Sequence, residues 1–123
     1  MRGSACILGQ ALDGFESFRT TTIIIMKTYV ILITFTAQGV QAVQDSPKRA
    51  VAFTQFLESS GIKTKGIYWT FGSYDGILLL EAPDEKSMHS AILTLAHAGN
   101  VKTETLRAYD AGEMEPLLAK IIS

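Results

Sequence analysis

The most informative stretch of the sequence is YWTFGSYDGILLLEAPDE, residues 68–85, in which two apolar segments flank a turn. Residues 72–76 read Gly-Ser-Tyr-Asp-Gly, and the aliphatic run Ile77–Leu80 follows them directly. Glycine and aspartate favour tight turns, and a short aliphatic run next to turn residues is typical of a buried strand. The stretch therefore predicts two antiparallel strands joined by a turn.

Two elements are expected before the first of these strands begins. Tyr29–Phe35 is apolar on both alternating faces, which predicts a strand buried on two sides. Ser46 and Pro47 form an N-cap and a first-turn proline, and apolar residues then recur at helical spacing until Gly61. The strand after this helix has one apolar face made of Ile67, Trp69 and Phe71.

The rest of the chain continues the alternation of helices and strands. A helix begins after Pro83-Asp84 and ends at Gly99-Asn100, and a strand follows over Val101–Tyr109. A short C-terminal helix is expected from about Glu113 to Ile121. The helix after Pro83-Asp84 has an apolar stripe at helical spacing: Met88, Ala91, Ile92, Leu95 and Ala96.

The element order βαββαβ predicts an α+β, ferredoxin-like fold with a four-stranded antiparallel sheet and a short C-terminal helix. In this arrangement the first and third strands lie in the middle of the sheet, and the charged second and fourth strands lie at its edges. Two helices cover only one face of such a sheet, so the other apolar face needs a second subunit. The sequence therefore predicts a homodimer of the α+β barrel type, or a higher oligomer built from it.

Three segments of the chain resemble the GYD domain family of small bacterial and archaeal proteins. They are TYVILITFTAQGVQAVQDSPKRAVAF, GIYWTFGSYDGILLLEAPDE and GNVKTETLRAYD, in this order, and the likeness covers roughly residues 27–121. Ser73 separates Gly72 from the Tyr74-Asp75 pair, so the Gly-Tyr-Asp motif departs slightly from its name. The resemblance implies the dimeric α+β barrel fold, and it implies no particular reaction.

Composition limits the possible partners. The 123 residues carry a formal net charge of −1 without a basic stripe, which argues against nucleic acid or an anionic membrane as a partner. The single cysteine, Cys6, cannot form an internal disulfide, and we expect a cytoplasmic protein. We expect residues 1–25 to be an extension, either mobile or the product of an upstream start, and residues 26–123 to form one domain.

Tyr74 and Asp75 are the candidate catalytic residues, and both have a second interpretation. An aspartate before Gly76 is a good turn former, and a tyrosine at the start of a strand often covers a core. A functional role requires Asp75 to be partly desolvated beside the Tyr74 phenol, where it would serve as a general base or orient one. Trp69 would then line an apolar pocket, although a tryptophan on a sheet is commonly a core or interface residue.

Three basic residues are candidate ligand contacts. Lys48 and Arg49 lie at the start of the first helix, where they oppose the helix dipole, and they would bind either an anion or a carboxylate of Asp45, Glu81 or a partner chain. Arg107 shares a face of the last strand with two threonines, and on the covered side of the sheet it would need a carboxylate or a ligand.

The two histidines cannot share a metal ion, because a spacing of eight residues separates them by ~12 Å along a helix. His97 is expected in solvent, and His89 lies at the edge of the apolar stripe as a candidate acid or base. No metal or cofactor is expected from any motif of the sequence.

The sequence leaves two functions open. Either the domain binds a small organic molecule near the Tyr-Asp turn, with proton transfer, isomerisation or cofactor-free oxidation as possible reactions, or it is an oligomeric binding or scaffold module in which the same residues are structural.

Overall fold

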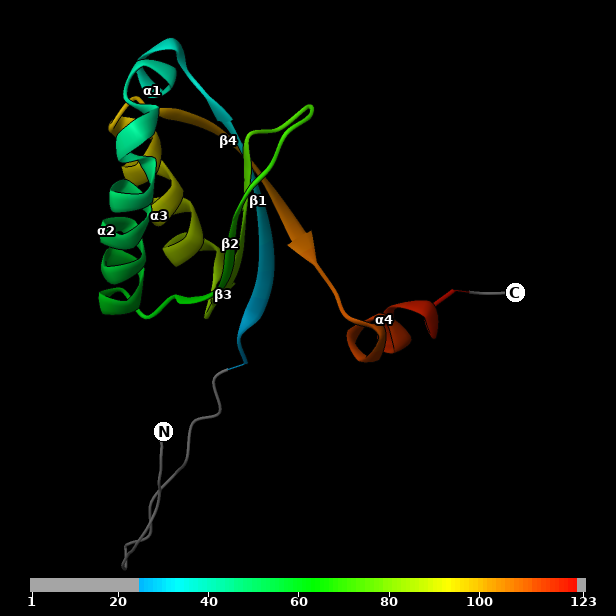
Figure 1. Cartoon of the computed structure of the whole chain (residues 1–123). Coiled ribbons are helices and arrows are strands. Elements are labelled where there is room, and N and C mark those ends of the chain that lie inside the picture. Colours follow the sequence, from blue (N-terminus) through cyan, green and yellow to red (C-terminus); the bar gives the residue numbers. More distant parts are fainter. Residues whose placement is uncertain (1–24, 122–123) are drawn as a thin grey trace, which may run out of the picture.

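The computed structural model describes residues 25–121 and contains one four-stranded antiparallel sheet with helices (Figure 1). The expected extension, residues 1–25, lies outside the described residues apart from Ile25. In chain order the elements are β1 (Lys27–Phe35), α1 (Ala37–Gln41), the 3-10 helix η1 (Val43–Asp45), α2 (Ser46–Ser59), β2 (Lys63–Trp69), β3 (Gly76–Ala82), α3 (Glu85–His97), β4 (Val101–Ala108) and α4 (Ala111–Leu118).

The strand order β2-β3-β1-β4 confirms the predicted ferredoxin-like arrangement. The central strand β1 is antiparallel to both neighbours, so that Ile31 lies between Leu78 of β3 and Thr105 of β4. The two charged strands, β2 and β4, are the edges, where exposed lysines discourage pairing with another sheet. A register shift between Thr64 and Gly66 interrupts the pairing of β2 with β3.

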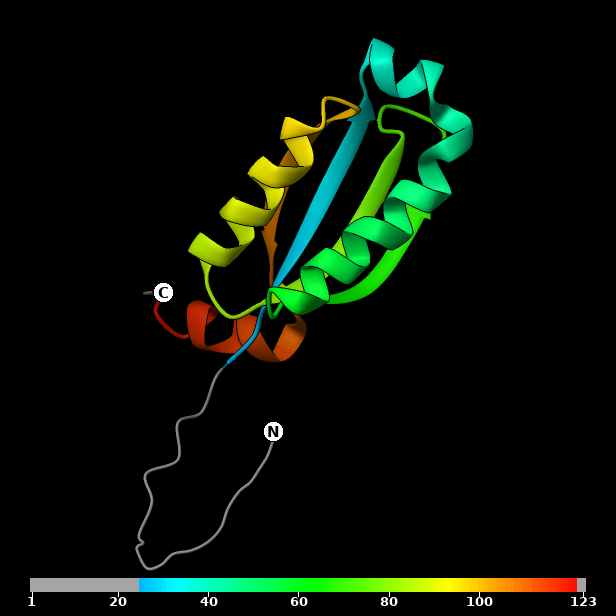
Figure 2. The ribbon, with the colours of Figure 1, turned by 90° about the vertical axis from the view of Figure 1, so that its left-hand side faces the viewer.

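The core lies between the sheet and the helices α2 and α3, which both cover the same face (Figure 2). Alternate residues of β1 and β3 point to this face, and the buried residues of the helices meet them. The fully buried side chains are Ile31, Leu57, Ile62, Leu80 and Met88.

The helix ends follow the expected local chemistry, with one correction. Gly61 and Gly99 have φ angles of +82° and +84° after α2 and α3, a conformation that favours glycine and ends a helix. The Asp84 side chain accepts a hydrogen bond from the Ser87 N–H at 2.8 Å and so caps α3. Ser46 is not the cap of α2, because the helix begins with Ser46 itself and Asp45 precedes it.

Two further features of the local structure were not anticipated. The segment between β1 and α2 contains α1 and η1, which the sequence analysis did not predict, because this polar segment has no apolar periodicity. Phe71 does not belong to β2: the strand ends at Trp69, and Phe71 is fully exposed in the connection to β3.

Among residues 25–121, no helix lies over the second face of the sheet (Figure 1). The alternating pattern places apolar side chains on it, because their neighbours in sequence point to the core. We call this surface the open face, and its apolar members are Val30, Leu32, Ile77, Leu79 and Leu106. None of the helices within residues 25–121 combines the length and the apolar character that a membrane span requires.

Candidate functional site

A cavity of about 470 Å³ lies between the helices and the sheet. Its size falls within the range of pockets that hold small organic molecules. The wall is mainly apolar, and side chains of β1, β2, β3, α2 and α3 contribute to it. Its apolar lining includes Ile33, Phe35, Phe53, Ile67, Leu78 and Leu95.

The cavity exists because the helices fill only one end of the space above the sheet. At that end Leu57 and Met88 are fully buried against Leu80. At the other end α2 presents Ala50 to the cavity, and Ala98 follows α3 there. Alanine is too short to reach the sheet from a helix layer, so the space above this end of the sheet stays open.

Asp75 lies at the mouth of this space, where β1 ends and β3 is about to begin. Its backbone N–H donates to the Ile33 carbonyl at 2.7 Å, and its carboxylate oxygen Oδ2 accepts from the Phe35 N–H at 2.8 Å. The residue is half-buried and lines the cavity. The Asp75 carboxylate therefore satisfies a backbone N–H at the end of β1, and the residue also lines the cavity.

Trp69 and Arg49 also line the cavity, and each is held by a hydrogen bond. The Trp69 indole Nε1–H donates to the buried Ser46 hydroxyl at 3.0 Å, which ties β2 to the first residue of α2. Arg49 Nη1 donates to the Ala42 carbonyl at 2.8 Å. Both bonds fix polar side chains at the rim of an apolar wall.

Tyr74 points elsewhere, although it precedes Asp75 in sequence. Its phenol donates a hydrogen bond to Glu104 Oε1 at 3.0 Å. Glu104 pairs with Leu32 in the register of β1 and β4, so this contact lies on the open face. The hydrogen bond to Glu104 and the charge of that carboxylate raise the pKa of the Tyr74 phenol above 10.0.

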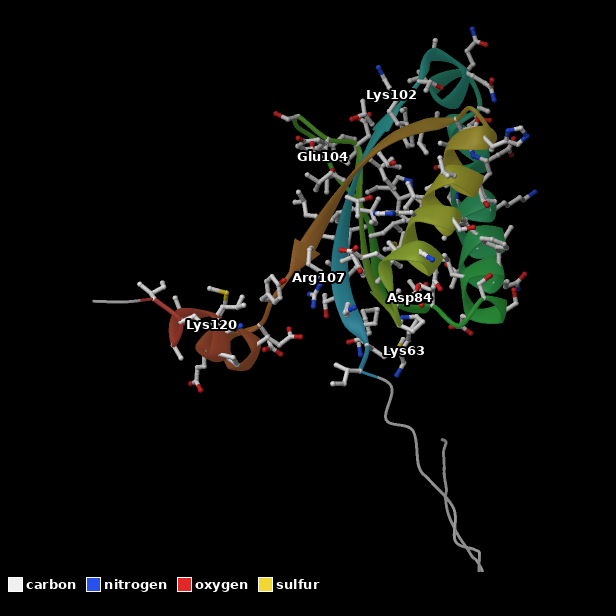
Figure 3. The ribbon with its side chains drawn as sticks, turned by 180° about the vertical axis from the view of Figure 1, so that it is seen from behind. Lys63, Asp84, Lys102, Glu104, Arg107 and Lys120 are labelled. Atoms are coloured by element: carbon white, nitrogen blue, oxygen red, sulfur yellow. The ribbon has the colours of Figure 1, made fainter. Side chains whose placement is uncertain are left out.

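The remaining predicted site residues lie away from the cavity. Lys48 and His89 are exposed on α2 and α3. Arg107 lies near the C-terminal end of β4, whereas Glu104 and Lys102 lie toward its other end (Figure 3). The Arg107 guanidinium carbon lies 4.3 Å from the ring centroid of Tyr109.

Arg107 faces the covered side, as the sequence analysis anticipated, because it pairs with the buried Tyr29. A carboxylate or a ligand was expected there, and the partners of Arg107 within the described residues are backbone carbonyls and aromatic rings. Nη1 donates to the carbonyls of Thr28 and Ala108, and the guanidinium also stands 5.7 Å from the centroid of the Tyr29 ring. Burial of Tyr29, followed by the nearby Glu85 carboxylate, raises the pKa of the Tyr29 phenol.

The structure thus brings Asp75, Trp69 and Arg49 together and leaves Tyr74, Lys48, His89 and Arg107 elsewhere. Sequence reasoning missed Ser46 and Glu104, the polar partners of Trp69 and Tyr74. Only the tertiary fold brings these partners together, because they are 23 and 30 residues away in sequence. Within residues 25–121, no cluster of three His, Cys, Asp or Glu side chains is placed to hold a metal ion.

Comparison with known proteins adds three findings. The pattern of the GYD domain family matches residues 29–118. A protein of Thermus thermophilus that is named glutamine synthetase and cystathionine beta-lyase binding protein is 33% identical over 90 residues, which cover 72% of this chain and 95% of that protein. The crystal structure of MtbAldR is similar with a TM-score of 0.52 at 16% identity. That likeness covers 79% of this chain and 64% of MtbAldR, and at this identity it shows the fold alone.

Proposed function

The chain belongs to the GYD domain family, and from this premise we propose that it is a homo-oligomeric binding protein whose cavity takes up a small organic molecule. The cavity itself carries the proposal, since about 470 Å³ of mainly apolar space is large enough for a ring-sized ligand. A wall of aliphatic and aromatic side chains favours an apolar ligand body.

The polar groups at the rim would orient this ligand. The Asp75 carboxylate is a hydrogen-bond acceptor for a hydroxyl or amine, and Arg49 is a donor for a carbonyl or carboxylate. Because one Asp75 oxygen already accepts from the Phe35 N–H, the other oxygen would be the one that meets the ligand or its proton. Catalysis by proton transfer would use this second oxygen as the base.

Self-association is supported by the open face. This face presents an apolar surface that no helix of the described part of the chain covers: Val30, Leu32, Ile77, Leu79 and Leu106. Contiguous apolar surface of this kind is unfavourable in water and commonly marks an interface. A second copy would cover the open face with a surface of the same shape and chemistry.

Native mass spectrometry of the gently desalted protein tests ligand binding. We expect an oligomer that carries a discrete extra mass. Ala50→Phe fills the cavity and should remove the extra mass, whereas Val51→Phe, on the exposed side of the same helix, should keep it. An oligomer that shows no extra mass, and that binds no member of a library of aromatic hydroxy and carboxy compounds, would contradict ligand binding.

Asp75→Asn separates a ligand contact from a purely structural role. Asparagine keeps a side-chain acceptor for the Phe35 N–H but removes the charge. Loss of the extra mass with the oligomer intact supports a ligand at Asp75. A ligand-free oligomer that dissociates on this substitution would favour the scaffold function.

A second candidate function rests on the Thermus relative, which is named for binding two enzymes. We propose that this chain, too, is a module that binds a metabolic enzyme. The test is co-elution of the purified protein with the glutamine synthetase and the cystathionine beta-lyase encoded by the same genome. A complex that forms equally well with the Ala50→Phe variant would assign the binding to the outer surface, and separate elution of both enzymes would exclude them as partners.

A further inference from the structure

Two elements project from the sheet on the side of the open face. The connection between β2 and β3, residues 70–75, and the helix α4 both leave the sheet away from α2 and α3, as Figures 1 and 3 show from opposite sides. They lie at opposite ends of the open face (Figure 1). We call the first element the hairpin tip. The open face is therefore flanked by a projecting element at each end.

The helix α4 has no core of its own. None of its residues is buried, and Leu117, Leu118 and the following Ile121 are exposed. Its start is nevertheless well formed, because Asp110 and Glu113 exchange hydrogen bonds in a capping box. A short helix in water gains little stability from its own hydrogen bonds, so α4 needs packing against another surface.

The hairpin tip presents Phe71, which is 101% exposed. The tip is held in shape by hydrogen bonds from the Thr70 N–H to the Asp75 carbonyl at 2.9 Å and from the Thr70 hydroxyl to the Tyr74 carbonyl at 2.6 Å. A bulky aromatic ring on a fixed turn, wholly in water, is costly unless it is covered in an assembly.

We propose that the hairpin tip and α4 form a reciprocal contact between two copies of this chain. In this dimer a two-fold axis crosses the strands, so that the open faces meet and Phe71 of each subunit packs on Leu117 and Leu118 of the other. The inference rests on the self-association proposed above and assigns its geometry. In this dimer the hairpin tip and α4 each gain an apolar partner through a single symmetric interface.

The positions of charged residues favour a two-fold axis that crosses the strands over one that runs along them. Lys102 lies at the hairpin end of β4, on the open-face side of the strand (Figure 3). Glu115 is exposed on α4, at the other end. An axis across the strands brings Lys102 of one copy toward Glu115 of the other, whereas an axis along the strands leaves these two residues at opposite ends of the interface.

Cysteine cross-linking in a Cys6→Ser background tests the arrangement. Two single variants, Phe71→Cys and Leu118→Cys, are each made with a different affinity tag, co-expressed and purified on both tags. A short bismaleimide is then added, and cross-linked dimer is measured by denaturing gel electrophoresis. Leu93→Cys, also exposed but on the outer side of α3, replaces Leu118→Cys in the control.

We expect cross-linked dimer from the Phe71→Cys and Leu118→Cys pair at least tenfold above the control pair and above either variant alone. Stronger cross-linking of Leu118→Cys with itself would overturn the proposal in favour of the axis along the strands. An intact dimer without any cross-link would overturn it while leaving self-association in place. A monomeric mass for the parent protein would refute self-association and, with it, this contact.

Discussion

Asp75 connects the turn, the end of β1 and the cavity through one side chain. Its carboxylate accepts from the Phe35 N–H, its backbone N–H donates to the Ile33 carbonyl, and it lines the pocket. A carboxylate that accepts from a partly buried N–H forms a charge-assisted hydrogen bond, which is stronger than a neutral one. Asp75 is therefore placed both to stabilise the fold and to contact a ligand in the cavity.

Replacing this carboxylate should destabilise the protein. Asp75→Ala leaves the Phe35 N–H without its acceptor, and we expect the free energy of unfolding to fall by ~1.5–3 kcal/mol in urea titrations. Ser73→Ala, in the same loop and exposed to solvent, is the matched control and should change stability by less than ~0.5 kcal/mol. Equal effects of the two substitutions would rule out a structural contribution of the Asp75 carboxylate.

Tyr74 should make stability depend on pH in the alkaline range. Because its hydrogen bond to Glu104 raises the folded-state pKa of the phenol above 10.0, its stabilising contribution is present below pH 10 and is lost as the pH rises through the folded-state pKa. The difference in stability between the wild type and Tyr74→Phe, measured by urea unfolding, should therefore shrink as the pH rises above 10.0. The same substitution in a Glu104→Gln background should show a smaller pH dependence, and a difference that grows with pH would refute the bond.

At the residue scale, the sequence predicted the turn but not the hydrogen-bond partners of its side chains. Gly, Tyr and Asp next to an aliphatic run identify a turn at the mouth of an apolar strand. The acceptor of Tyr74 and the donor to Asp75 lie 30 and 40 residues away, so only the pairing of β1 with β3 and β4 defines them. This is why Tyr74 and Asp75, adjacent in sequence, have separate partners.

At the scale of elements, α1 depends on a close approach that only glycine permits. A Cβ atom on Gly39 would collide with the Asn100 carbonyl oxygen just before β4. Gly39→Ala should therefore destabilise the protein by ~1–3 kcal/mol in urea unfolding. Gly112→Ala in α4, where a Cβ would meet only the Asp110 side chain at 3.5 Å, should leave stability unchanged or raise it by up to ~0.5 kcal/mol. Similar effects at both positions would show that α1 does not pack on Asn100.

Helices and strands with a strong apolar periodicity were predicted correctly. Those that form because of tertiary contacts were missed. The strands and the helices α2 and α3 have clear apolar patterns, and their order was confirmed. The helix α1 has no such pattern and is held by contacts with the start of β4, such as the Thr36 hydroxyl donating to the Gly99 carbonyl at 2.6 Å. The apolar alternation of β2 continues to Phe71, but the turn begins at Thr70 and takes Phe71 out of the sheet.

At the scale of the whole molecule, the open face follows from the two-layer architecture, in which one helix layer packs on one sheet. Two helices cover one face of four strands, and the sequence already indicated a second apolar face on β1 and β3. The cavity was less predictable, because its volume depends on how far α2 and α3 stand from the sheet at one end. Alanines in a helix pattern are compatible with close packing as well as with an open space.

The open face should control assembly. Leu106 lies on this face and is 41% exposed, whereas Leu93 lies on the outer side of α3 and is 70% exposed. Leu106→Glu places a charge where a second copy would exclude water, so we expect the dimer to dissociate at least tenfold more readily in sedimentation equilibrium. Leu93→Glu replaces a more exposed leucine by the same charge and should leave the mass unchanged. If both variants stay as associated as the parent protein, the subunits meet through another surface. If Leu93→Glu alone dissociates, that surface is formed by the helices, and the open face is left for a different partner.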